Sequence, residues 1–146
     1  MPSDREAAPA RASFDYFDHE ADIGIIGRGP TLPDAFAAAA GAMFAIMADP
    51  AKVQERILVQ FEFEEADPEF ALVTVLNRLL AEARLQQAVF SAFEVSRNGL
   101  RWKVEARGEP WNESLEHGTE VKGATLTMLS VKACESGWEA RCVVDV

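Results

Sequence analysis

The stretch TLPDAFAAAAGAMFAIM, residues 31–47, decides the fold because it predicts a helix with a defined start, a defined end and an apolar face. Thr31 is a good N-cap, with Asp34 three residues later as a shortened capping box. Asp49-Pro50 ends the run. The alanines of 37–40 allow a sheet or another helix to approach closely. Apolar side chains recur at helical spacing at Leu32, Phe36, Ala39, Ala40, Met43, Phe44 and Met47.

Strand patterns lie on both sides of this helix. Residues 14–17 and 23–26 are strand-like and are separated by an acidic turn. From residue 57 to residue 63 the apolar residues alternate with polar ones, which predicts a half-buried strand. Asp67-Pro68 then supplies an N-cap and a first-turn proline for a second helix. The buried stripe of that helix is Leu72, Val75, Leu76, Leu79, Leu80 and Ala83.

The C-terminal third reads as strands and turns. Residues 90–106 predict a hairpin around Asn98-Gly99, a pair that suits a type I′ turn. After a polar loop at 108–118, residues 121–133 predict a strand, and 138–146 predict the last strand. Since strands dominate and hairpins connect them, we expect an α+β fold, mainly an antiparallel β-sheet with two amphipathic helices packed on it.

The charge of the chain bears on its partners. Its 146 residues include 24 acidic residues against 14 Lys and Arg, a net charge of −10. This charge repels a polyphosphate, so we expect no direct nucleic-acid binding. Residues 1–12 lack periodicity and predict a disordered N-terminal tail, and residues 13–146 predict one domain.

Membrane-spanning segments, signal peptides and cysteines indicate the cellular compartment of a protein. No run approaches the roughly 20 apolar residues of a membrane span, and Asp4 and Glu6 interrupt the N-terminal segment, which has no signal-peptide pattern. Two cysteines are too few for a disulfide framework. We therefore expect a cytoplasmic protein without a membrane partner. Cys134 and Cys142 could face each other across the last hairpin, although two buried free thiols are expected instead.

The acidic turn FDHEADIGI, residues 17–25, is the first candidate site. Asp18 and Asp22 are four residues apart, with His19 and Glu20 between them, so a compact turn could direct several oxygens to one point. Alternatively, Asp18 caps the turn through backbone N–H groups and Glu20 is simply solvated. The residues alone leave these two interpretations open.

Asp145 favours the metal-binding interpretation. It lies on the face opposite the apolar row of the last strand, and a terminal strand in a sheet can bring it beside the first strand. Its carboxylate, with the main-chain carbonyl or terminal carboxylate of Val146, would add oxygen ligands to those of Asp22. Oxygen-only ligation selects Ca²⁺ or Mg²⁺ over zinc. The alternative is an exposed aspartate without a role.

His19 and His117 are the only histidines, and with two cysteines they make no recognisable zinc spacing. Either could be a general base, which leaves a metal-dependent hydrolase as an alternative function with His19 or Glu20 as the base. A histidine beside acids is more often a hydrogen-bond donor that orients them. Lys122, directly after the Glu120-Val121 pair, could pair with the carboxylates, meet a phosphate of a partner, or simply protect a sheet edge.

Taken in order, these segments resemble the archease family. The resemblance covers the chain from Phe14 onward and rests on the following motifs: Asp18-His19-Glu20-Ala21-Asp22-Ile23-Gly24, Thr31-Leu32 with Ala35-Phe36 and Met43-Phe44, Leu76-Asn77 with Leu79-Leu80, Gly108-Glu109 with His117, Glu120-Val121-Lys122, and Val144-Asp145-Val146. The family usually has Thr where this chain has Glu20, and Tyr-His where this chain has Leu126-Thr127.

The resemblance implies a non-enzymatic role. Archeases are accessory proteins of the GTP-dependent RNA ligase that joins 2′,3′-cyclic-phosphate or 3′-phosphate ends to 5′-hydroxyl ends. They promote guanylylation of the ligase and its multiple turnover in tRNA splicing and RNA repair. By resemblance, a divalent cation, calcium with magnesium as the alternative, would be bound by Asp22, Asp145 and Val146. A chaperone-like modulator of RNA-modifying enzymes is the alternative within the same family. Residues expected around the ion or at the partner are Asp18, His19, Glu20, His117, Glu120 and Lys122.

Overall fold

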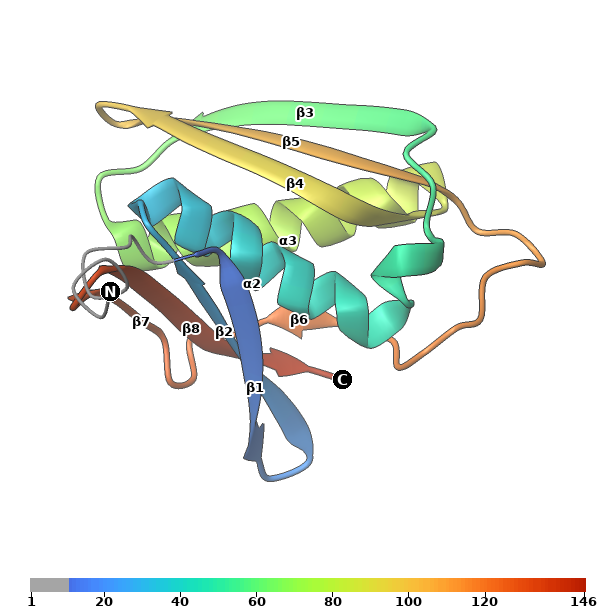
Figure 1. Cartoon of the computed structure of the whole chain (residues 1–146), viewed down its shortest axis with the longest axis horizontal. Helices are drawn as coiled ribbons and strands as arrows, with labels where there is room; N and C mark the ends of the chain where they lie inside the picture. The colour runs from blue at the N-terminus through green and yellow to red at the C-terminus, as the bar shows by residue number, and fades with distance from the viewer. Residues whose placement is uncertain (1–10) are drawn as a thin grey trace, which may run out of the picture.

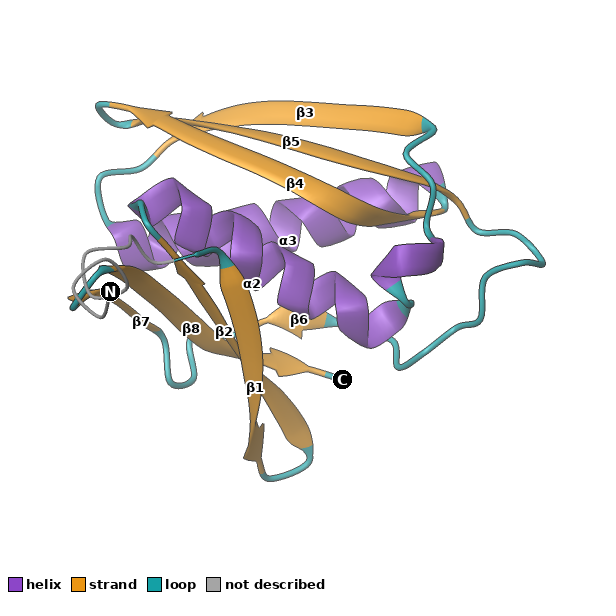
Figure 2. Cartoon of the chain, viewed as in Figure 1, coloured by secondary structure: helices purple, strands orange, loops and turns teal. Residues whose placement is uncertain are grey.

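Two antiparallel sheets enclose two helices in the computed structural model of the chain, which describes residues 11–146 (Figure 1). The larger sheet has the order β1-β2-β8-β6, and β7 also pairs with β8; the smaller sheet has the order β3-β5-β4. Figure 2 shows the helices as a middle layer between the two sheets. The strands are β1 (Ser13–His19), β2 (Asp22–Gly29), β3 (Ile57–Glu64), β4 (Ala88–Asn98), β5 (Arg101–Pro110), β6 (Gly123–Ala124), β7 (Ser130–Cys134) and β8 (Gly137–Asp145).

The predicted α+β class is confirmed, with the strands divided between two sheets on opposite sides of the helices. Of the predicted tail, residues 1–10 lie outside the described residues, and Arg11 and Ala12 precede β1. Within residues 11–146, no helix has the length and apolar character needed to cross a membrane.

Helix α2 (Leu32–Met47) occupies the centre of the molecule because it is apolar on nearly every side. The Thr31 hydroxyl accepts a hydrogen bond from the Asp34 N–H at 3.2 Å, as the predicted N-cap requires. The Phe36 ring stacks on Trp102 of β5 with 4.8 Å between ring centroids. Eight side chains of α2 are buried: Leu32, Ala35, Phe36, Ala39, Ala40, Ala42, Met43 and Phe44.

Small residues bring α2 and the larger sheet into backbone contact. A Cβ atom added to Gly27 of β2 would lie 2.3 Å from both the Ala35 carbonyl oxygen and the Ala39 nitrogen. No side chain fits at that distance. The alanines of α2 and Gly27 together therefore determine how closely β2 packs on the helix.

Helix α3 (Pro68–Gln86) begins as predicted, with the Asp67 carboxylate accepting a hydrogen bond from the Glu69 N–H at 2.8 Å. Its C-cap is Gln87, which adopts a left-handed conformation with φ of 52°. Between α2 and β3 the chain forms a short 3-10 helix at Pro50–Lys52.

The predicted strand at 121–133 is wrong. The chain forms the two-residue strand β6, an irregular loop at 125–129, and then β7. The Thr125 hydroxyl donates a hydrogen bond to the Val143 carbonyl at 2.8 Å and accepts one from the Thr127 N–H at 3.1 Å. These side-chain bonds, one to β8 and one within the loop, replace a regular ladder, and Met128 adopts a positive φ of 56°. The apolar composition of the segment gave no signal of this loop.

Two smaller predictions also need correction. In the β4–β5 hairpin, Asn98 pairs with Arg101, so Gly99 and Leu100 form the loop, and Gly99 has the positive φ, 63°. The expectation of two buried thiols is correct for Cys142 and wrong for Cys134, which is exposed. Cys134 pairs with Gly137, so the two cysteines do not face each other.

Candidate functional site

Strands β2 and β8 bring Asp22 beside the last residues of the chain. The two strands are antiparallel, and their register pairs Ile23 with Val144. One residue further along each strand, Asp22 and Asp145 come next to each other in this register. The Val146 N–H donates a hydrogen bond to Asp22 Oδ1 at 3.2 Å. Residues 124 positions apart in the sequence therefore share one corner of the larger sheet.

A third segment joins this corner from the opposite side of β8. The Lys122 N–H donates a hydrogen bond to the Asp145 carbonyl oxygen at 2.7 Å, and Gly123 of β6 pairs with Asp145. The Asp145 main chain is thus held by residues 122–123, while its carboxylate is exposed to solvent. Lys122 reaches the corner through its backbone, and its side chain is exposed.

The other polar residues of the β1–β2 region lie at different positions relative to Asp22. His19 pairs with Asp22 across the two strands, and its Nδ1 atom lies 3.7 Å from Glu20 Oε2. Glu20 has a positive φ of 56° and a side chain that is 85% exposed. Asp18 pairs with Ile23, so alternation along the strand places its side chain on the face opposite that of His19. The structure therefore groups His19 with Asp22 and separates Asp18 from them.

Oxygen atoms make up most of the donor groups at this corner, with the His19 imidazole beside them. Across the described residues, 11–146, no group of three or more His, Cys, Asp and Glu side chains is arranged to hold a metal ion. The corner instead offers the carboxylates of Asp22 and Asp145 and the main-chain carbonyl of Val146. Such a set suits a hard cation, which would take its further oxygen ligands from water or from a partner. Carboxylate and carbonyl oxygens are the ligands that Ca²⁺ and Mg²⁺ prefer.

His117 and Glu120 lie in a neighbouring cavity, away from Asp22. The cavity has a volume of about 540 Å³ and is formed by the end of α3 and the loop that follows β5. The His117 ring stacks on Trp111 with 3.8 Å between centroids and 17° between planes. The structure thus separates these two predicted residues from the oxygen corner. Trp111, which no sequence motif indicated, forms an aromatic wall of this cavity.

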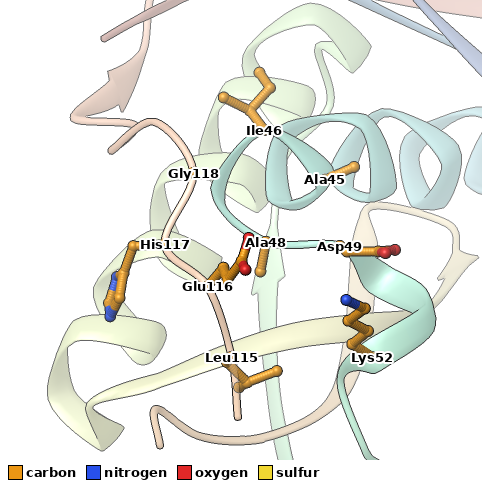
Figure 3. A pocket seen from close by; sticks show the side chains of 9 residues that line it. All are labelled: Ala45, Ile46, Ala48, Asp49, Lys52, Leu115, Glu116, His117 and Gly118. Atoms are coloured by element: carbon orange, nitrogen blue, oxygen red, sulfur yellow. The ribbon is translucent and has the colours of Figure 1, made fainter. Parts of the chain in front are cut away.

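A second cavity of about 310 Å³ lies on the other side of the same loop (Figure 3). Figure 3 shows the His117 ring pointing away from Asp49 and Lys52. The loop is held on the end of α2 because the Gly118 N–H donates to the Met47 carbonyl at 2.7 Å. A Cβ atom at Gly118 would lie 2.4 Å from the Ile46 carbonyl oxygen, so the close approach requires glycine.

A buried carboxylate surrounded by partly exposed cations lies farther along the larger sheet. Glu139 of β8 is 8% exposed and bonds to Arg141 at 2.8 Å and Arg28 at 3.3 Å, with Lys132 at 3.9 Å. Burial alone would raise the pKa of Glu139. The hydrogen bond and charge of Arg141, together with the charges of Lys132 and Arg28, outweigh burial and hold that pKa below its ordinary value.

Comparison with known proteins agrees with this architecture. The Archease protein family (MTH1598/TM1083) matches residues 14–146. The chain is 35% identical to Protein archease of Sulfolobus acidocaldarius over 136 residues, covering 91% of this chain and 98% of that protein. It is also 35% identical to Protein archease of Thermococcus gammatolerans, with the same coverage.

Two solved structures are similar in fold. The solution structure of protein 1598 of Methanobacterium thermoautotrophicum has a TM-score of 0.83 and 30% identity, covering 92% of this chain and 99% of that one. The crystal structure of an archease from Thermotoga maritima, described as a possible chaperone, has a TM-score of 0.63 and 16% identity, covering 89% of this chain and 94% of that one. The family match and the curated relatives together show that the chain belongs to the archease family.

Proposed function

We propose that this chain is a non-catalytic accessory protein of an RNA ligase that joins 3′-phosphate or 2′,3′-cyclic-phosphate ends to 5′-hydroxyl ends. In this role it promotes guanylylation of the ligase and multiple turnover during tRNA splicing or RNA repair. The observation that carries the proposal is the contact between Asp22 and Val146, which places two carboxylates and a carbonyl at one corner of an archease-family chain. The choice of an RNA ligase as the partner rests on the resemblance to the archease family.

The proposed ligands of the divalent cation are Asp22, Asp145 and the carbonyl of Val146. Two like charges at opposite positions of paired strands repel each other and destabilise a sheet. A cation bound between the two carboxylates relieves this repulsion. When bound, such an ion supplies positive charge that can neutralise phosphate oxygens. Asp22 and Asp145 would hold it at the edge of the protein, where oxygens of the ligase or its nucleotide can reach it. His19, beside Asp22, would orient that carboxylate by a hydrogen bond.

The charge of the whole chain is consistent with an accessory role. With a net charge of −10, the protein repels RNA and favours a basic protein surface. The ligase therefore contacts the RNA, and this chain contacts the ligase.

A guanylylation assay with the ligase from the same organism tests the proposal. Wild-type protein is expected to raise guanylylation and turnover number, and Asp22→Asn and Asp145→Asn are expected to reduce both gains. Glu62→Gln is the matched control because Glu62 is a surface carboxylate on the other sheet, paired with Arg101 at 3.0 Å. No gain with wild-type protein would contradict the proposal. Hydrolysis of phosphoesters by the chain alone would instead favour a metal-dependent hydrolase.

A chaperone-like modulator is the second candidate. Leu126 and Met128 are 61% and 52% exposed in the loop beside β8, and they provide apolar surface for an unfolded client. This candidate predicts that the protein suppresses aggregation of an RNA-modifying enzyme. It further predicts that Leu126→Ser weakens the suppression, whereas Asp22→Asn does not.

A further inference from the structure

Helix α3 holds the backbone that supports Asp145, and two of its side chains make the contact. Asn77 is half-buried, and its amide forms two hydrogen bonds with the main chain of Ala124. The Ala124 N–H donates to Asn77 Oδ1 at 2.9 Å, and Asn77 Nδ2 donates to the Ala124 carbonyl at 3.2 Å. A side chain thus takes the place of a neighbouring strand on the free side of β6.

Arg84, two turns further along α3, binds the same segment. Its Nη2 atom donates hydrogen bonds to the Lys122 carbonyl at 2.6 Å and to the Val121 carbonyl at 3.3 Å. Residues seven apart lie on one face of a helix, so Asn77 and Arg84 act on the same side of α3. We call these two side chains the α3 clamp.

The clamped segment is also the segment that bonds to Asp145. The Lys122 N–H donates to the Asp145 carbonyl, and Gly123 pairs with Asp145. A two-residue strand such as β6 is too short to be stable on its own. Its place beside β8, seen near the C-terminus in Figure 1, therefore depends on contacts outside the sheet. The α3 clamp supplies those contacts.

We infer that Asn77 and Arg84 are positioning residues for the carboxylate of Asp145 and the carbonyl of Val146. The inference rests on the proposed ion site and adds to it two residues that touch neither the ion nor its ligands. Hydrogen bonds run from α3 to residues 121–124, from Lys122 to Asp145, and from Val146 to Asp22. Loss of the clamp would loosen one wall of the site while leaving both carboxylates in the chain.

The test uses two measurements on the full-length protein. Calcium chloride is titrated calorimetrically into the EDTA-treated protein, and amide hydrogen exchange is followed at Lys122 and Val146 without metal. Asn77→Ala and Arg84→Met are expected to weaken Ca²⁺ binding by about tenfold, since each removes two hydrogen bonds. Both are also expected to speed exchange at the two amides, and Arg84→Lys should restore binding because an ammonium can still donate to the two carbonyls.

A control on the same helix separates positioning from general destabilisation. Arg78→Met removes an arginine from the same helix, but Arg78 lies over Phe61 and bonds to the Glu62 carbonyl, away from residues 121–124. Arg78→Met should bind Ca²⁺ as wild type does. If Asn77→Ala does not fold, the Arg84 variants decide, because Arg84 is exposed.

The outcomes distinguish this inference from the proposed function. Unchanged Ca²⁺ affinity in both clamp variants would overturn the inference while leaving the ion site intact. If wild-type protein binds no Ca²⁺, the proposed ion site is wrong. The amide exchange rates alone then test whether the α3 clamp positions the end of β8. Faster exchange at Lys122 and Val146 would then support positioning of the strand end by α3, and unchanged exchange would overturn it.

Discussion

At the scale of single residues, the environments of the two cysteines differ in a way that chemistry can detect. Burial raises the pKa of Cys142 to about 12, so its thiol stays protonated near neutral pH. Cys134 is exposed. A thiol reagent at pH 8 is therefore expected to modify Cys134 alone in the native protein, and both cysteines in urea. Mass spectrometry after alkylation measures this, and rapid labelling of Cys142 in the native protein would contradict the structure.

Glu139 makes stability depend on pH. Its folded-state pKa lies below its ordinary value of 4.5, so its contribution is present above that pH and is lost as pH falls through the folded pKa. Glu139→Gln is expected to lower the free energy of unfolding by about 2 kcal/mol at pH 7, because three cations lose their buried partner. Urea unfolding should show that the difference in free energy of unfolding between wild type and Glu139→Gln becomes smaller below pH 4.5, because Glu139 is then increasingly protonated.

The control for Glu139 is Glu62→Gln, since Glu62 is 47% exposed and its pair with Arg101 contributes little. An equal loss of stability for Glu139→Gln at pH 7 and well below pH 4.5 would show that packing, and not charge, explains its effect.

At the scale of secondary-structure elements, β2 packs against the backbone of α2 at Gly27, and a substitution there tests this packing. Gly27→Ala would place a Cβ atom against helix backbone, which cannot move aside as a flexible side chain can. The expected loss is about 1–3 kcal/mol or more in the free energy of unfolding, measured by chemical denaturation. Gly41→Ala, inside α2 and 3.6 Å from the Phe14 ring, is expected to stabilise by up to about 1 kcal/mol. Equal effects from the two changes would be inconsistent with this packing.

The elements that could be predicted from the sequence are those with local signals. Thr31 and Asp67 cap their helices as expected, and alternation identified β3. The loop at 125–129 could not be predicted, because the bonds of Thr125 depend on a carbonyl of β8, eighteen residues away. The division into two sheets likewise depends on α2 being buried on both sides, which its alanines permit but do not specify.

The candidate site was predictable in part for the same reason. Asp22 and Asp145 stood out as acidic residues at strand ends, and the register of β2 with β8 brings these positions together. Asn77 and Arg84 gave no such signal, since a polar residue on an amphipathic helix is ordinarily a solvated one. Their role becomes visible only when residues 121–124 are seen to lie against α3.

At the scale of the whole molecule, the proposed function and the net charge of −10 together predict that the partner, and not this chain, contacts the RNA. Fluorescence anisotropy of a labelled RNA with a 3′-phosphate is expected to stay unchanged when this protein is added alone at physiological salt. Association with a basic ligase should weaken as salt rises, because screening reduces the attraction. Saturable RNA binding by the isolated chain would contradict this account.

The central claim for the molecule is that the β1–β2 turn and the end of β8 hold one cation together. Calorimetric titration of Ca²⁺ into wild type, Asp22→Asn, Asp145→Asn and the double variant tests it most directly. One site is expected in the wild type, with each single change weakening binding and the double variant losing little more than either, since both residues serve the same ion. Wild-type affinity in both single variants, or fully additive losses, would contradict a shared site.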